Sequence, residues 1–258
     1  MKLPVMSASF NHNRAWLYLR GTAVFALFLL VSGAALGQDP HDQNHPPRIV
    51  AIDPGHGGHD TGARGSENLL EKHVAIRFSK ILADQLKTKY KVLLTRTDDY
   101  DVPFEDRVAK SNHAQADLFI SIHTGGSLLH NLSGVSIFYY EKPPGSAYGP
   151  DNAAHAATAV NQLALWDVVT PEHIERSRYL AELIKLRLLE NNNNLKLTIT
   201  GVPLFVAVGA DMPTLLIEIG YVTNPGDAQL LNNTEVLIGY AGSILKAVDD
   251  FFSNKLRL

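Results

Sequence analysis

The sequence predicts a single α/β domain, built on a mostly parallel or mixed β-sheet with helices on both faces. Short apolar segments alternate with amphipathic ones along the chain, which is the pattern of such folds. A chain of 258 residues that is 45% hydrophobic also has enough apolar residues for one sizeable core. We expect this domain to span residues 48–253.

The first expected strand, residues 49–52, is apolar throughout, as a strand buried on both faces would be. Asp53-Pro54-Gly55-His56-Gly57-Gly58 follows it, and the proline and glycines cannot continue a strand. His56 is therefore placed where a buried strand ends. Such positions often carry chemistry, because the strand fixes the backbone while the loop leaves the side chain accessible.

The remaining elements follow from the spacing of apolar residues. Helices are expected over residues 68–88, 104–115, 171–191 and 236–252, and strands at 91–96, 117–123, 134–140, 202–208 and 214–219. The strand at 117–123 ends in His123, and Gly125-Gly126 comes shortly after it. This arrangement repeats the one around His56, so two histidines are expected at the ends of buried strands.

Residues 1–37 differ from the rest of the chain. Lys2, Arg14 and Arg20 precede an apolar run that ends in small residues at Gly37, which predicts a secretory signal peptide and an exported, periplasmic or cell-wall-associated protein. An uncleaved membrane anchor is the alternative, but the run is short for a spanning helix, so no stable span is expected after cleavage. Residues 38–47 are polar and contain prolines, which predicts a short linker.

Charge and cysteine content exclude several classes of function. Without the leader, 20 Lys and Arg stand against 26 Asp and Glu, a net charge of about −6, which argues against nucleic acid as a partner. The chain has no cysteine, so it has neither disulfides nor a catalytic thiolate. The nucleophile of any reaction must be water, a hydroxyl, a carboxylate or a histidine.

A hydrolytic zinc site needs about three nitrogen or oxygen ligands, one position open to water, and a nearby carboxylate to accept a proton. His56 and His123 are candidate ligands. Glu71 and Glu67, both near the start of the helix between them, compete for the third place, and each could instead be a solvated glutamate favoured by the helix dipole.

Glu218 lies within Leu215-Leu216-Ile217-Glu218-Ile219-Gly220, an otherwise apolar strand. A buried carboxylate is costly unless a cation or a metal compensates it. One explanation is a salt bridge to Arg96 or Arg107. The other is a general base whose pKa is held near the working pH by its surroundings.

Several motifs, in order, resemble those of one enzyme family. They are Asp53-Pro54-Gly55-His56-Gly57-Gly58, Glu71-Lys72, Leu94-Thr95-Arg96-Thr97-Asp98, Arg107, residues 116–123, and residues 213–224. From Arg48 to Phe252 the chain is similar to the zinc-dependent N-acetylmuramoyl-L-alanine amidases of the amidase-3 family.

This resemblance implies one Zn²⁺ ion held by His56, Glu71 and His123, with Glu218 as the catalytic carboxylate, and it selects Glu71 over Glu67. The implied reaction is hydrolysis, in peptidoglycan, of the amide between N-acetylmuramic acid and L-alanine of the stem peptide. The chain departs from the family at two places. His123-Thr124-Gly125-Gly126 stands where the family usually has His-Ala-Asn-Ala, and Asp60-Thr61-Gly62-Ala63 replaces Asp-Pro-Gly-Ala.

Residues 143–175 read as an insertion that contains a helix near 152–166. Division-associated members of the family carry a regulatory helix here that covers the zinc until a protein activator displaces it. The resemblance therefore implies such a helix, with Glu172, His173 or Glu175 as blocking groups. Two alternative functions remain open. The protein could be a zinc peptidase that acts within the stem peptide, or a non-catalytic or regulatory cell-wall-binding protein with the same fold.

Overall fold

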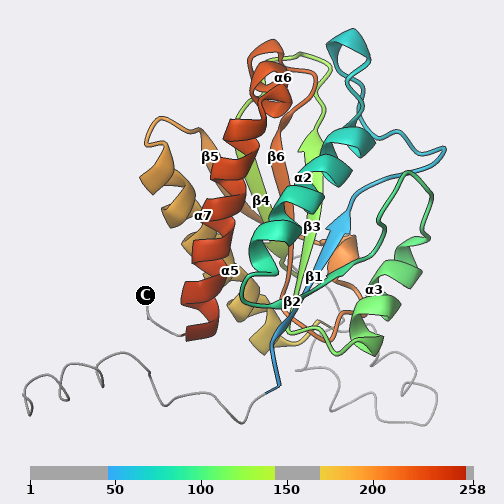
Figure 1. The fold of residues 1–258 in the computed structure, drawn as a ribbon, viewed down its shortest axis with the longest axis vertical. Coiled ribbons are helices and arrows are strands. Elements are labelled where there is room, and N and C mark those ends of the chain that lie inside the picture. Colours follow the sequence, from blue (N-terminus) through green and yellow to red (C-terminus); the bar gives the residue numbers. More distant parts are fainter. Residues whose placement is uncertain (1–45, 143–168, 254–258) are drawn as a thin grey trace, which may run out of the picture. The chain divides into compact units, whose positions relative to one another are not determined.

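A computed structural model of the chain describes residues 46–142 and 169–253, which fold around one six-stranded mixed sheet (Figure 1). The strands are β1 (Ile49–Pro54), β2 (Lys91–Leu94), β3 (Leu118–Gly125), β4 (Val135–Tyr140), β5 (Leu197–Val202) and β6 (Thr214–Tyr221). Their order across the sheet is β2-β1-β3-β6-β4-β5. β2, β1, β3 and β6 run parallel, whereas β4 is antiparallel to β6 and parallel to β5. The mixed sheet expected from the sequence is confirmed.

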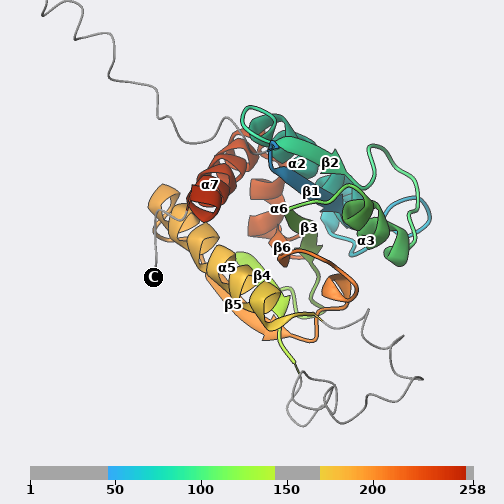
Figure 2. The ribbon, with the colours of Figure 1, turned by 90° about the horizontal axis from the view of Figure 1, so that it is seen from below.

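Each face of the sheet has its own apolar cluster, because successive strand residues point to opposite sides. On one face Ile120, Leu215 and Ile217 belong to a cluster with α2 (Glu71–Leu86), α5 (Pro171–Asn191) and α7 (Thr234–Ser253). On the other, Phe119 and Leu216 belong to a cluster with α3 (Phe104–His113) and the 3-10 turn η3 (Phe205–Ala207). Figure 2 shows α3 on the side of the sheet away from α5 and α7. Helices on both faces are thus confirmed.

The sequence misplaced one strand and missed one helix. The strand expected at 202–208 is wrong: β5 ends at Val202, and η3 follows it. Pro203 has no N–H for a strand ladder, and the true signal was the alternation of half-buried and exposed residues from Leu197. The missed helix is α6 (Pro225–Asn232), whose first N–H groups are capped by the Asn224 side chain.

The sheet topology sets where functional groups can meet. β1, β3 and β6 are parallel neighbours, so their carboxyl ends lie at one edge of the sheet. In the register of β3 with β6, His123 is opposite Glu218, and in that of β4 with β6, Ser136 is opposite the same glutamate. Residues far apart in the sequence are therefore neighbours at this edge.

Three predictions concern residues that lie outside the described ranges. These are the signal peptide at 1–37, most of the linker at 38–47, and the helix near 152–166. In the part of the chain that the structure describes, no helix is both long and apolar enough to cross a membrane.

Candidate metal centre

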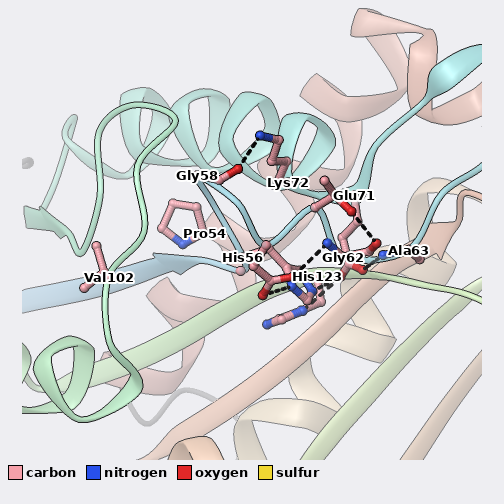
Figure 3. A network of polar contacts seen from close by, with 12 residues as sticks. Pro54, His56, Gly58, Gly62, Ala63, Glu71, Lys72, Val102 and His123 are labelled. Atoms are coloured by element: carbon pink, nitrogen blue, oxygen red, sulfur yellow. Dashed lines mark hydrogen bonds and ion pairs between the residues drawn. The ribbon is translucent and has the colours of Figure 1, made fainter.

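His56, Glu71 and His123 come together at the carboxyl edge of the sheet. His56 Nε2 lies 3.0 Å from Glu71 Oε1, and His123 Nδ1 lies 2.9 Å from the same oxygen. One ligand atom from each residue falls within 4.8 Å of the others, and the two imidazole rings meet edge to face with centroids 4.9 Å apart. Figure 3 shows the three side chains converging from the loop after β1, from the start of α2 and from β3.

The Glu71 carboxylate is buried and fully engaged. Besides the two histidines, it accepts hydrogen bonds from the N–H of Ala63 (2.8 Å) and from the N–H of Thr124 (3.0 Å). Burial alone would raise the pKa of Glu71, but the hydrogen bonds from His123 and His56 outweigh it and hold the pKa well below its usual range. This carboxylate therefore stays ionised, as a metal ligand must.

The orientation of His56 is set by a second carboxylate. Its Nδ1 lies 2.7 Å from Asp60 Oδ2, which leaves Nε2 directed at Glu71. Asp60 is itself fixed, because its Oδ1 accepts the N–H of Gly62 at 3.0 Å. Burial would lower the pKa of His56, but hydrogen bonds and charge from Glu71 and Asp60 leave it raised. A carboxylate behind a histidine is a common arrangement in metal sites.

Two buried arginines hold the backbone of the loop that carries His56. Arg96 donates to the carbonyls of Pro54 (2.9 Å) and Gly55 (2.7 Å). Arg107 donates to Asp53 Oδ1 (2.9 Å), to the Pro54 carbonyl and to the His56 carbonyl. Since Arg96 binds carbonyls and Arg107 pairs with Asp53, neither neutralises Glu218, and the salt-bridge explanation for that residue is wrong.

The opposite side of the same loop is fixed by Lys72. Its Nζ donates to the Gly58 carbonyl at 2.8 Å (Figure 3). It also pairs with Asp99 (2.7 Å), which accepts the N–H of Gly58. Within the loop, Gly55 is required because a Cβ there would lie 2.4 Å from the His123 ring. The sequence had suggested glycine for a tight turn, and close approach of the second imidazole is the added reason.

Glu218 lies beside this cluster on β6, opposite His123 in the strand register. Its environment differs from that of Glu71, because the larger effect here is burial, which raises the pKa of Glu218, and a hydrogen bond to Tyr221 offsets it only in part. The negative charge of Glu71 raises the pKa further, and His123 lowers it. Glu218 is thus a carboxylate whose proton affinity is enhanced.

The donor set fits a divalent metal ion of the zinc type. Two imidazole nitrogens and one ionised carboxylate oxygen are the usual protein ligands of hydrolytic zinc sites. The His56 and His123 side chains keep 21% and 20% of their surface exposed, so solvent reaches the cluster. The structure thus brings together the three expected ligands, while Glu67 lies in the 3-10 turn η1 (Ser66–Asn68) that precedes α2.

The expected blocking groups do not lie at this cluster. Glu172, His173 and Glu175 occupy the first turns of α5, whose Ser177 accepts the N–H of Thr214 at the start of β6. Glu218 is four residues further along that strand, about 13 Å at the rise of a β-strand. In the described part of the chain, the prediction that these three side chains block the site is wrong.

Sequence reasoning also missed two residues near the cluster, Asp60 and Tyr221. The signal for Asp60 was its position four residues after His56, in a loop whose glycines allow the chain to fold back. Tyr221 had no comparable signal, because its placement depends on an irregularity of β6 that strand periodicity does not reveal.

The fold and the cluster define an α/β protein with a candidate metal centre of the hydrolytic type. Residues 50–250 match the model of the Amidase_3 family, described as N-acetylmuramoyl-L-alanine amidase, and the chain belongs to this family. It is 30% identical over 221 residues to the amidase AmiA of Escherichia coli, covering 80% of this chain and 76% of AmiA.

Two further comparisons extend this result. The chain is 27% identical to the amidase AmiC of Neisseria meningitidis over 81% of its own length, but it spans only 53% of that relative. Among solved structures, AmiC2 of Nostoc punctiforme matches with a TM-score of 0.63 and 26% identity, over 80% of this chain and 97% of AmiC2.

Proposed function

We propose that this protein is a peptidoglycan hydrolase that cleaves the amide bond between N-acetylmuramic acid and L-alanine of the stem peptide. The observation that carries the proposal is the pairing of the His56, Glu71 and His123 cluster with a separate carboxylate, Glu218, on the adjacent strand. Membership of the Amidase_3 family, together with amidase relatives, supports the choice of substrate.

The metal in this proposal is one Zn²⁺ ion, with His56 Nε2, a Glu71 carboxylate oxygen and His123 Nδ1 as its ligands. When bound, zinc lowers the pKa of a coordinated water and polarises the carbonyl to be attacked. The chain's own contribution is to present three donors in a fixed arrangement. Asp60 orients His56, and the N–H groups of Ala63 and Thr124 hold the Glu71 carboxylate.

Glu218 moves the protons. Its carboxylate accepts one proton as water adds to the carbonyl carbon of the lactyl group. It then donates that proton to the alanine nitrogen as the carbon–nitrogen bond breaks, so the products are a lactyl carboxylate and a stem peptide with a free amine. A carboxylate whose pKa is raised by burial is suited to both steps, because the best acid–base catalyst has a pKa near the working pH.

An exported location, in the periplasm or at the cell wall, is part of this proposal because the substrate lies there. The family resemblance adds a protein activator that acts on residues 143–175. This stays a prediction, since most of that range lies outside the described residues. Deleting residues 148–169 should raise basal activity on purified cell wall, whereas a folded variant of unchanged activity would contradict the prediction.

The proposed function is tested by digesting purified peptidoglycan with the chain from residue 38 onward. The digestion is run as prepared, with added zinc, and with a chelator, and the products are identified by mass spectrometry. Stem peptides that begin at L-alanine, and that disappear with the chelator, are expected. Cleavage between amino acids of the stem would instead identify a peptidase, and intact muropeptides despite bound zinc would contradict an active amidase.

A further inference from the structure

β6 contains a one-residue bulge directly after Glu218. His123 is opposite Glu218, but Gly125 is opposite Tyr221, so β3 advances two residues while β6 advances three. Gly220, within the bulge, has φ +148°, a conformation that favours glycine.

The bulge decides which way Tyr221 points. In a regular strand, residues three apart face opposite sides of the sheet, so Tyr221 would point away from Glu218. One extra residue reverses this, and Ile219 and Val222, on either side of Gly220 and Tyr221, both lie in the cluster of the other face. Tyr221 is therefore returned to the face that carries Glu218.

The backbone of the bulge is held by a buried aspartate. Asp227 Oδ2 accepts the N–H of Tyr221 (2.9 Å) and the N–H of Gly134 (2.8 Å), which precedes β4. A bulge leaves backbone groups without their ladder partners, and this carboxylate satisfies one of them. The same contacts fix the distance between Tyr221 and the start of β4.

The Tyr221 ring occupies the space over Gly125. A Cβ at position 125 would lie 2.2 Å from Tyr221 Cε1 and 2.3 Å from Cδ1, so no larger residue fits while the ring is there. Position 125 is one of the three, 124–126, at which this chain departs from the His-Ala-Asn-Ala pattern of the family, and it is the one where that pattern has asparagine. The chain thus has an aromatic ring packed on glycine where an amide side chain would otherwise stand.

The Tyr221 hydroxyl joins a short polar chain that leads to Glu218. It lies 3.0 Å from Ser136 Oγ, which in turn accepts a hydrogen bond from Thr198 Oγ1 at 3.2 Å. Ser136 is opposite Glu218 in the β4–β6 register, so the hydroxyl lies near the carboxylate. Because Ser136 Oγ accepts the Thr198 proton, its own hydroxyl proton can be donated to the Tyr221 oxygen. The Tyr221 hydroxyl proton is then available for donation to the Glu218 carboxylate.

We propose that Tyr221 is a positioning residue for the Glu218 carboxylate, with its hydroxyl oriented by Ser136 and Thr198 and its ring placed by Gly125. A hydrogen bond from this hydroxyl to Glu218 would restrict the carboxylate to one orientation relative to the metal cluster. The inference rests on the proposed amidase reaction for its kinetic consequence, but not for the contact itself. It assigns a role to Gly125, one of the residues that differ from the family pattern.

The kinetic test compares Tyr221→Phe, Ser136→Ala and the matched control Tyr139→Phe on peptidoglycan fragments. Tyr139 lies on β4, but its side chain packs against the cluster of the opposite face. Tyr221→Phe keeps the ring and loses the hydroxyl, so kcat should fall about tenfold, the order expected for one hydrogen bond, with KM little changed. Ser136→Ala should lower kcat less, and Tyr139→Phe should leave it unchanged.

A second measurement needs no activity. Urea unfolding of the metal-free wild type, Tyr221→Phe, Glu218→Gln and the double variant gives the coupling between the two side chains. Non-additive changes are expected. Additive changes, or an unchanged kcat in Tyr221→Phe, would overturn the proposal. A wild type that releases no stem peptides would instead overturn the proposed reaction, while the coupling would still report on the contact.

Discussion

The two glutamates of the site occupy opposite kinds of environment. Glu71 lies at the start of α2, where its carboxylate contacts two imidazoles and accepts hydrogen bonds from two backbone N–H groups. Glu218 lies in an apolar strand, where burial is the largest influence on its pKa and the nearby Tyr221 hydroxyl offsets it only in part. The pKa of Glu71 is accordingly lowered, and that of Glu218 is raised.

The difference shows how one residue type can serve two purposes within one site. A carboxylate surrounded by donors keeps its charge and is suited to hold a cation. A carboxylate in apolar surroundings binds a proton more readily and is suited to exchange one. Placing one carboxylate at the start of α2 and the other on β6 keeps the ligand from competing with the base for the same proton.

The largest expected effects come from removing each glutamate in turn. Glu218→Gln should lower turnover by about 10²–10⁴-fold, as expected for loss of a general base, and should still bind zinc. Glu71→Ala should lose both zinc and turnover, because it removes a ligand. Release of stem peptides and the zinc content of the purified variants are the two measurements.

Glu235→Gln is the control for this pair, because Glu235 is an exposed residue in the first turn of α7. It should behave as wild type in both measurements. Retained turnover in Glu218→Gln would remove that residue from the base role. Loss of zinc from the same variant would make it a ligand instead, and the distinction between the two carboxylates would no longer hold.

Much of the Glu71 environment could be read from the sequence. Local patterns identify His56 and His123 as strand-end residues, and the parallel topology then brings those ends together. The choice between Glu71 and Glu67 could not be made from spacing alone, since both fall near the start of one helix. It required the family resemblance, and the structure places Glu71 against both imidazoles.

The Glu218 environment was less accessible to sequence reasoning. The apolar strand marked Glu218 as unusual, but the salt bridge to Arg96 or Arg107 could be excluded only once their partners were known. Strand periodicity assigns Tyr221 to the wrong face, because one residue of bulge reverses the alternation. Long-range irregularities of this kind depend on tertiary contacts such as those of Asp227, which no local pattern encodes.

The Arg96→Lys substitution tests how strongly the structure of the His56 loop depends on the hydrogen bonds of this buried arginine. The side chain is fully buried and donates to four carbonyls, those of Pro54, Gly55, Lys72 and Asp98. Lysine lacks the planar fork of donors, so Arg96→Lys should destabilise the protein by about 2–3 kcal/mol and weaken zinc binding. Urea unfolding and zinc titration measure the two effects.

Arg178→Lys is the matched control, because Arg178 is exposed and pairs with Glu175 on the surface of the same helix. A surface substitution of this kind should change the free energy of unfolding by less than about 0.5 kcal/mol. If the two substitutions changed the free energy of unfolding and the zinc affinity equally, the hydrogen bonds of Arg96 to backbone carbonyls would contribute little to holding the metal ligands.

Asp60 should have a smaller influence, confined to the metal. Its carboxylate orients His56 from the exposed side of the loop, with 59% of the side chain accessible. Asp60→Ala should weaken zinc affinity by about tenfold, the lower end of the range for residues that support a ligand, with little change in stability. Competition with a chelator measures the affinity, and Asp84→Ala, an exposed aspartate on α2, should not change it.

The smallest expected effect is on the pH dependence of the free energy of unfolding, measured on metal-free protein. The direction of this dependence should differ between the two glutamates. A raised pKa in the folded state means that stability gained from the Glu218 proton is present at low pH and is lost as pH rises through that pKa. Glu218→Gln avoids this loss, so it should be more stable than wild type near neutral pH, and the difference should vanish in acid.

The ionised Glu71 carboxylate contributes to stability with the opposite dependence on pH. Its stabilisation is present at neutral pH and is lost as pH falls through its lowered pKa, so Glu71→Gln should be less stable than wild type near neutral pH. Urea unfolding at neutral and acidic pH measures both, and two variants shifting in the same direction would mean that the environments of the two carboxylates do not differ in the way the structure indicates.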